Sequence, residues 1–139
     1  KGWYTSPYDI PHDVSIVASY KVSGRVLLSA NWVYQSGRPI NAPVARWEYS
    51  NLILPYFPGR NNDRMPAYHR LDLGFELKGK QKPGRRYESS LNFSIYNFYS
   101  RKNANAVYFI QDYETQNKTK AMKVSLFRFM PSVTYNFKF

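Results

Sequence analysis

The feature that most constrains this chain is an alternation of apolar and polar residues with a period of two, repeated in five stretches. In YHRLDLGFELK, residues 68–78, leucine or phenylalanine occupies every second position from 71 to 77, and most positions between them are charged. Because successive side chains of a β-strand point to opposite faces of its sheet, this pattern predicts strands with one apolar and one polar face. No stretch has the 3.6-residue period of an amphipathic helix, so the sequence predicts an all-β fold.

These stretches predict five long antiparallel strands. The first two form a hairpin, because only a short turn containing Ser23 and Gly24 separates them. Pro131 falls inside the last stretch, and we expect a bulge or a strand start there, because proline cannot donate a ladder hydrogen bond. We place the strands at about 13–22, 25–36, 66–78, 86–99 and 122–139.

The connections between these strands alternate between short and long. Short turns are expected at 22–25 and 79–85, whereas 36–65 and 100–121 are long and irregular. The first long segment contains RWEYSNLIL, which favours an additional short strand. Transmembrane β-barrels have short periplasmic turns and longer extracellular loops, so this asymmetry favours an antiparallel transmembrane β-barrel segment.

The composition agrees with a transmembrane barrel and leaves a soluble alternative open. Aromatic residues make up 18% of the chain, and 13 residues are Tyr. There is no apolar run of the roughly 18 residues that a membrane-spanning helix needs, whereas barrel strands need only about 9 to 11 residues of alternating polarity. A soluble β-sandwich would show the same alternation, but with turns of similar length at both ends and no preference for Tyr and Trp at strand tips.

Several Tyr and Trp residues fall near the ends of the expected strands. Amphipathic rings at the two membrane interfaces are typical of transmembrane barrels. We therefore expect an interface girdle formed by Tyr20 and Tyr87 near the short turns, and by Trp32, Tyr34 and Tyr99 near the long loops.

Little in the sequence points to catalysis. There is no cysteine, and the two histidines, His12 and His69, have no metal-ligand spacing. The carboxylates Asp72 and Glu76 share a strand face with two basic residues, so ion pairs facing a polar lumen explain them better than acid/base catalysis. We expect no enzyme activity, no catalytic or metal-binding residue and no cofactor.

The formal net charge of +11 is compatible with nucleic acid, an anionic membrane surface or an acidic ligand. Basic and aromatic residues interleave in RRYESSLNFSIYNFYSRK, residues 85–102. The aromatic residues there mostly occupy the apolar positions, away from the charges, so we do not expect nucleic-acid binding. Cations near strand ends suit the phosphates of lipopolysaccharide or a polar lumen.

The first long segment is the best candidate for contact with a ligand or a partner. Its aromatic rings offer stacking faces and its charged groups offer hydrogen bonds, which suit sugars, peptides or a covering protein subunit. The alternative for each residue is that it packs against its own loop. The candidate residues are Arg46, Trp47, Tyr49, Tyr56, Phe57, Arg60, Asp63 and Arg64.

Four stretches of the chain resemble a known family. They are IPHDVSIVASYKVSGRVLLSANWVYQSGRPI (10–40), RMPAYHRLDLGFELKGK (64–80), NFSIYNFYSRKNANAVYF (92–109) and KVSLFRFMPSVTYNFKF (123–139). Together they resemble the C-terminal part of a TonB-dependent outer-membrane receptor of the SusC-like type, abundant in Bacteroidetes. The resemblance is most specific at YHRLD, at YNFYSRKN and at the aromatic C-terminus.

The resemblance implies that residues 1–139 form the last five strands of a 22-stranded barrel in the bacterial outer membrane, with no plug domain in this chain. In such a receptor a nutrient ligand binds outside, and energy passed through TonB moves the plug and admits the ligand. The implied partners are the lipid bilayer and lipopolysaccharide, the plug and other strands of the receptor chain, the TonB complex through the absent N-terminal part, a SusD-like surface lipoprotein and the barrel-assembly machinery. The identity of the ligand is not implied.

The last strand carries an apolar stripe up to its final residue: Val133, Tyr135, Phe137 and Phe139. In the family that this chain resembles, such a strand is the β-signal that the barrel-assembly machinery recognises. An edge strand with unpaired backbone groups is able to pair with another open edge. A stripe that only completes a lipid-facing surface is the alternative, and both roles are compatible.

Two alternatives to the receptor hypothesis stay open. A complete small barrel of about eight strands would take extra strands from VARWEYSNLIL and NAVYFIQDY, and would be structural or adhesive. A fragment that serves as a substrate of the assembly machinery is the other, and the start at Lys1 leads us to expect a processed or partial product. The edge of the first strand discriminates, because it pairs with the last strand only in a small closed barrel.

Overall fold

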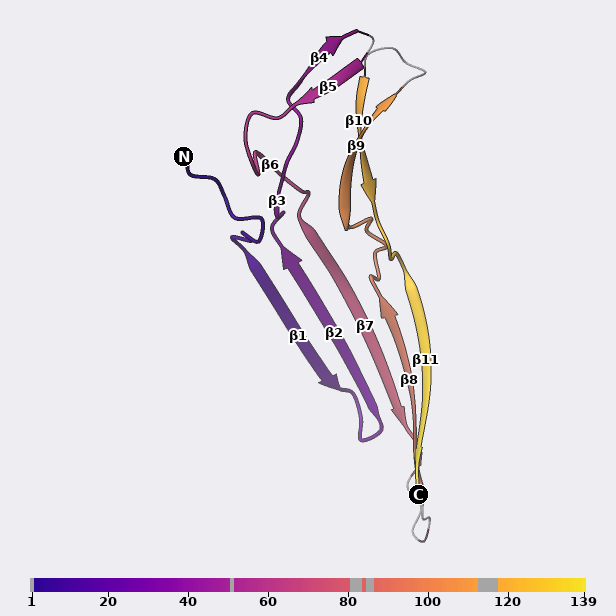
Figure 1. Cartoon of the computed structure of the whole chain (residues 1–139). Coiled ribbons are helices and arrows are strands. Elements are labelled where there is room, and N and C mark those ends of the chain that lie inside the picture. Colours follow the sequence, from indigo (N-terminus) through magenta and orange to yellow (C-terminus); the bar gives the residue numbers. More distant parts are fainter. Residues whose placement is uncertain (1, 51, 81–83, 85–86, 113–117) are drawn as a thin grey trace. The chain divides into compact units, whose positions relative to one another are not determined.

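The computed structural model describes residues 2–50, 52–80, 84, 87–112 and 118–139 (Figure 1). All regular secondary structure in these ranges is β-strand, and the strand pairs of determined register are antiparallel. The predicted all-β, antiparallel class is therefore confirmed. No helix suited to crossing a membrane occurs in this part of the chain.

The chain divides into two compact units, which are described separately. One unit comprises residues 1–13, 35–68 and 103–126 and contains the long connections. The other unit comprises residues 14–34, 69–102 and 127–139 and contains almost all of one large sheet.

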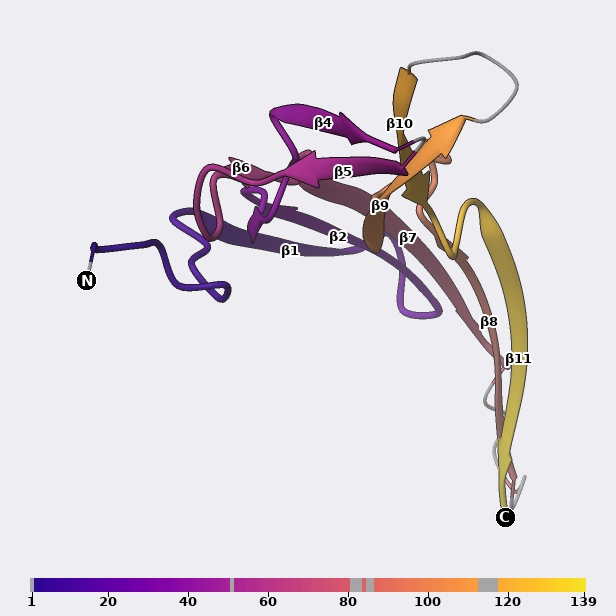
Figure 2. The ribbon, with the colours of Figure 1, turned by 45° about the horizontal axis from the view of Figure 1, so that its top comes forward.

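The large sheet has five strands in the order β1-β2-β7-β8-β11. Neighbouring strands alternate in direction, so the outer strands β1 and β11 run the same way, toward the short turns (Figure 1). The two views show β8 and β11 side by side (Figure 2). The strands are β1 (Asp13–Lys21), β2 (Val26–Gln35), β7 (Tyr68–Lys78), β8 (Glu88–Tyr96) and β11 (Met130–Lys138).

The register across β7, β8 and β11 separates an apolar face from a polar face. Phe75 lies opposite Phe93, which lies opposite Val133, and the two phenylalanine rings are 6.1 Å apart. One residue along each strand, on the other face, Ser94 pairs with Ser132 and their hydroxyl oxygens are 2.6 Å apart. The alternation read from the sequence is thus aligned between strands, which gives the sheet two faces of different polarity.

Asn97 directly follows β8 and is the most deeply buried large side chain of the described residues, with 0% exposure. Its φ of 52° is left-handed, a region that Asn tolerates better than most residues. Its side-chain amide donates to the carbonyl oxygen of Arg101 at 2.9 Å and accepts from the Arg101 backbone N–H at 3.1 Å. The side chain therefore closes the turn that follows β8 by replacing backbone pairing.

A polar cluster joins this turn to β7. The Asp72 carboxylate accepts from the backbone N–H of Asn97 at 3.0 Å and from Arg70 Nε at 2.9 Å. The Arg70 guanidinium also donates to the Tyr96 hydroxyl at 2.7 Å and lies 4.4 Å from the centre of that ring. The expected ion pairing on the polar face is present for Arg70 and Asp72.

The other unit consists of three small two-stranded sheets and their connections. Its buried apolar side chains are Ala42 and Met65, each 7% exposed. The side chain of Asn62 imitates strand pairing, because it accepts from the Ala42 N–H and donates to the Ala42 carbonyl. The strands are β3 (Pro39–Ile40) with β6 (Asp63–Arg64), β4 (Ala45–Tyr49) with β5 (Leu52–Tyr56), and β9 (Ala106–Asp112) with β10 (Lys118–Val124).

Two expectations about strand positions need correction. The last strand was expected from 122, but residues up to Val124 belong to β10 and the large sheet resumes only at Met130. The segment 100–121 was expected to be irregular, yet β9 and the start of β10 pair within it. Apolar residues alternate on both sides of this boundary, with a change of phase between Leu126 and Phe127. The expectation treated the two stretches as one strand, and the local pattern does not show that they pair with different partners.

Many apolar side chains of the large sheet are exposed. Val133, Tyr135 and Phe137 on β11 are 63%, 62% and 60% exposed, and all residues of β1 and β11 are exposed. Pro131 lies in β11 opposite Ile95. Because β11 is an outer strand, a proline without an N–H is tolerated there better than in a central strand.

We predict that Asn97→Ala destabilises the protein by about 1–3 kcal/mol, because it removes the buried hydrogen bonds to the Arg101 backbone. Asn97→Gly should cost less, because glycine accepts the left-handed conformation. Thermal unfolding followed by circular dichroism measures both, with the exposed Asn92→Ala as control. Equal unfolding midpoints for Asn97→Ala and the control would contradict the anchoring role.

Candidate functional site

The β4–β5 hairpin carries the aromatic part of the predicted ligand-contact segment. Trp47 lies opposite Leu54, and Tyr56 lies opposite Ala45. Since cross-strand partners share a face, Trp47, Tyr49, Leu54 and Tyr56 form one apolar face, and Arg46 is on the other. All four are exposed, Trp47 to 67%. This hairpin face is therefore accessible for stacking on a ligand or a partner.

The charged candidates near this hairpin are engaged within their own unit. Arg64 pairs with the Asp9 carboxylate and also donates to the backbone carbonyls of Asp9 and Gly37 at 3.2 Å and 3.0 Å. Asp63 accepts from the backbone N–H of Arg64 at 2.7 Å, and the Arg60 guanidinium lies 5.6 Å from the centre of the Tyr4 ring. Arg60 and Arg64 therefore contact the N-terminal segment, whereas Asp63 bonds within its own loop.

The structure thus divides the predicted contact segment into two groups. The rings of Trp47, Tyr49 and Tyr56 share an exposed face, and Phe57 follows β5 with 45% exposure. The charged residues at 60, 63 and 64 serve local packing, which is the alternative that the sequence left open. The sequence could not separate the groups, because the partner of Arg64 is Asp9, 55 residues away.

Three of the five predicted girdle residues lie in one row on the apolar face of the large sheet. The ring centres of Trp32 and Tyr34 are 6.0 Å apart, those of Tyr34 and His69 6.5 Å, and those of His69 and Tyr99 5.5 Å. We call these four residues the aromatic row. His69 was not predicted to belong to it. The sequence did contain a sign of this, because His69 is two residues before Leu71 in β7 and therefore lies on the same face.

Polar atoms link the members of the aromatic row. His69 Nδ1 and the Tyr99 hydroxyl are 2.7 Å apart. Partial burial raises the pKa of the Tyr99 hydroxyl, while a hydrogen bond with the Trp32 side chain and the positive charge of Arg101 act in the opposite direction. The Tyr99 hydroxyl is therefore neutral at physiological pH and serves as a hydrogen-bonding group.

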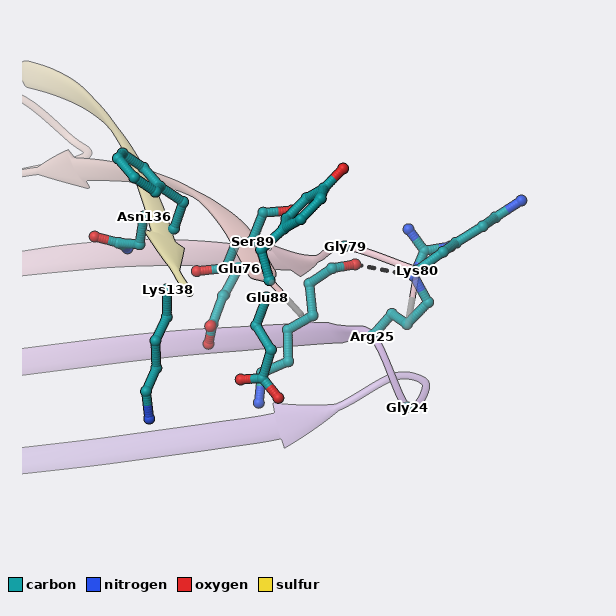
Figure 3. A pocket seen from close by; sticks show the side chains of 13 residues that line it. Gly24, Arg25, Glu76, Gly79, Lys80, Glu88, Ser89, Asn136 and Lys138 are labelled. Atoms are coloured by element: carbon teal, nitrogen blue, oxygen red, sulfur yellow. Dashed lines mark hydrogen bonds between the residues drawn. The ribbon is translucent and has the colours of Figure 1, made fainter. Parts of the chain in front are cut away.

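The other two girdle candidates, Tyr20 and Tyr87, belong to the short-turn end of the sheet and are exposed. Tyr87 also lines a cavity of about 810 Å³ there. On the polar side of this cavity, the side chains of Glu76, Glu88 and Lys138 point the same way (Figure 3). Carboxylates and cations occur together, so the cavity suits polar groups of either sign and does not select one ligand charge.

The four candidate assembly residues form a continuous stripe along β11. Tyr135 and Phe137 stack with ring centres 6.2 Å apart, and Phe137 meets Phe139 edge to face at 5.3 Å. Val133 continues the stripe opposite Phe93. Because β11 is an outer strand, the stripe lies beside a row of backbone groups that have no partner strand in the described part of the chain.

Metal-binding geometry is absent from the described residues, where no cluster of three His, Cys, Asp or Glu side chains could hold an ion. The backbone N–H of His12 donates to the Ser36 hydroxyl, and His69 belongs to the aromatic row. No protein-family model, curated protein or solved structure matches this chain.

We predict that Arg64→Ala speeds hydrogen exchange in residues 5–13, because it removes the contacts that hold Asp9. Trp47→Ala, which truncates an exposed ring, should leave exchange in that segment unchanged. Hydrogen exchange read by mass spectrometry distinguishes the two variants. Equal exchange in both would mean that Arg64 does not hold the segment.

Proposed function

We propose that this chain is a wall segment of a transmembrane β-barrel in the bacterial outer membrane, and that the barrel is a TonB-dependent receptor that imports a nutrient ligand. The observation that carries the proposal is the large sheet, which has one exposed apolar face, one polar face and two open edges.

The apolar face supports contact with lipid. Removing apolar surface from water is worth about 25 cal/mol per Å², and an apolar sheet face of this size is not left in water without a cover. A soluble β-sandwich covers such a face with a second sheet, but the buried apolar side chains of the described residues are only Ala42 and Met65. The acyl chains of lipids would cover the apolar face without a second sheet.

Strand length and loop asymmetry support the same reading. The five strands of the large sheet have 9, 10, 11, 9 and 9 residues, and barrel strands that cross a bilayer have about 9–11. Its turns are short at one end, while the connections at the other end contain the three small sheets. We assign the short turns to the periplasm and the long connections to the outside.

The open edges support a barrel larger than this chain. In a bilayer every backbone N–H and C=O needs a partner, so neither β1 nor β11 can stay an edge. The two strands run in the same direction (Figure 1), so bringing them together would pair them in parallel. A barrel in which all neighbouring strands are antiparallel therefore needs an odd number of further strands between β11 and β1. Copies of this sheet arranged in a ring with the same orientation would not provide them, because β11 of one copy would be parallel to β1 of the next. The 22 strands implied by the family leave an odd number of others.

The transport role comes from the resemblance to SusC-like receptors. It places the plug, the TonB contact and most of the ligand site in other parts of the receptor chain. Here the exposed aromatic face of β4–β5 is the part suited to touch a ligand or a SusD-like lipoprotein on the outer surface.

The small closed barrel is the weaker alternative. It would need VARWEYSNLIL and NAVYFIQDY in the wall, but β4–β5 and β9–β10 pair as separate two-stranded sheets. It would also need β1 paired with the last strand, whereas β1 pairs with β2 alone in the described residues.

We predict that Val133→Lys reduces the amount of folded protein in the outer membrane, because a lysine on the lipid side of a barrel costs about 2–4 kcal/mol near the bilayer centre. Thr134→Lys, one residue along the same strand, places the charge on the polar face and should be tolerated. Immunoblots of unboiled outer-membrane fractions, in which folded barrels migrate faster, measure both. Equal loss in the two variants would oppose lipid contact at Val133.

We also predict that Phe139→Ala slows barrel assembly and spares ligand affinity in the molecules that assemble, because the residue ends the β11 stripe and is not part of the long connections. Pulse-chase labelling of the folded form gives the assembly rate. Leu77→Ala, which truncates an apolar side chain of the inner strand β7, is the control. Normal assembly of Phe139→Ala would remove the β-signal role.

A further inference from the structure

We infer that the cavity at the short-turn end of the large sheet binds a small zwitterionic ligand, a short peptide, between the Glu76 carboxylate and the Lys138 ammonium group. The inference deepens the proposed function by naming a class of imported nutrient, and it rests on that function for placing the cavity in the barrel lumen. A receptor for neutral sugars would need neither of these two charges.

The cavity has the size of a site for a small molecule. Its volume of about 810 Å³ lies within the range of about 300–1,000 Å³ that is usual for such sites. The ends of β7, β8 and β11 and the turn between β1 and β2 line it, all within one compact unit (Figure 3). Because β7, β8 and β11 are neighbours in one sheet, their register fixes the order of the groups that line the cavity.

A row of neutral polar residues separates the two charged residues along the sheet. Ser90 lies opposite Asn136, and both are hydrogen-bonding residues of the cavity lining. Ser90 also lies opposite Lys78, and Glu76 is two residues before Lys78 on β7. Lys138 is two residues after Asn136 on β11, so Glu76 and Lys138 lie on opposite sides of this row.

The spacing of the two charged residues suits a short peptide. Glu76 lies opposite Asn92 and Lys138 lies opposite Glu88, so the two positions differ by about 13 Å along β8 and by two strand spacings, or about 10 Å, across the sheet. Both side chains extend from the backbone and shorten the gap between their charged groups. An extended peptide of about three residues, roughly 10 Å long, would reach both groups.

Glu76 and Lys138 are open to a ligand. In the described part of the chain, neither side chain forms an ion pair or a hydrogen bond, and both point the same way from the sheet (Figure 3). Glu88, opposite Lys138, makes an interaction of its own and is not assigned to the ligand. The two open charges would each gain a charge-assisted hydrogen bond from a ligand group of opposite sign.

The remaining cations of the cavity decide between a zwitterion and a ligand of one charge. Lys78 and Arg25 belong to the lining, and Arg25 Nε donates to the Lys78 carbonyl at 2.9 Å, which positions the guanidinium. A purely cationic ligand would meet these positive charges and Lys138. A purely anionic ligand would meet the Glu76 carboxylate. A ligand with an ammonium group and a carboxylate matches both parts of the lining.

The test uses the complete outer-membrane protein, purified in detergent, with trialanine as the probe. N-acetyl-trialanine lacks the ammonium group of trialanine, and trialanine amide lacks its carboxylate. Isothermal titration calorimetry gives the dissociation constant of each peptide. We expect trialanine to bind about tenfold more tightly than either blocked peptide, as the loss of one charge-assisted hydrogen bond predicts.

Two variants assign each ligand charge to its residue. Glu76→Gln should weaken trialanine about tenfold and leave N-acetyl-trialanine within about twofold, because that peptide has no ammonium group to lose. Lys138→Gln should weaken trialanine similarly and leave trialanine amide within about twofold. Lys21→Gln removes an exposed charge of β1 outside the cavity lining and should change none of the three affinities by more than about twofold.

Equal affinities of the three peptides for the wild type would overturn the inference, as would the absence of trialanine binding. Equal losses of all three peptides in Glu76→Gln would also overturn it, because a residue that binds the ammonium group does not affect a peptide without one. Absence of the protein from the outer membrane would refute the proposed function. An outer-membrane protein that binds no trialanine would refute the inference alone.

Discussion

The uncovered apolar face of the five-stranded sheet is the constraint on which the rest of this structure depends. Cross-strand rows such as Phe75, Phe93 and Val133 align the apolar positions of neighbouring strands, so the register that forms the sheet also forms a continuous apolar surface. Hydrogen bonds between strands hold the sheet together, but they leave this surface exposed to whatever surrounds it. Under the proposed function, a bilayer covers this surface and further strands pair with the two edges. The sheet is then one part of a larger assembly.

The ends of the sheet are organised differently from its middle. At the long-connection end, Asn97 turns the chain out of β8 with its own side chain, and Asp72 ties that turn to β7 and Arg70. The same side chain of Asn97 bonds the backbone N–H and carbonyl of Arg101. Polar groups thus stabilise the end of β8. In the sequence, the hairpin β4–β5 belongs to the connection between β2 and β7, and its aromatic rings are exposed.

The large sheet could be predicted from the sequence because each of its strands has the same local signal, the period of two. The β9–β10 hairpin was missed because β10 and β11 both alternate, and the change of phase between Leu126 and Phe127 was the only local sign that they pair with different partners. Partner choice is a long-range property, and so are the contacts of Arg64 with Asp9. Among the candidate site residues, the row of Trp32, Tyr34 and Tyr99 followed from strand-end positions, whereas the central part played by Asn97 depends on a buried turn that periodicity does not reveal.

The central claim is that this sheet is part of the wall of a larger outer-membrane barrel. The most direct test is an antibody against residues 131–139, used to find the cell fraction and the denatured mass of the polypeptide that carries them. The account predicts one band in the outer-membrane fraction, several times heavier than a chain of 139 residues. A band in the soluble fraction would contradict lipid contact, and an outer-membrane band with the mass of 139 residues would contradict closure by further strands of the same polypeptide.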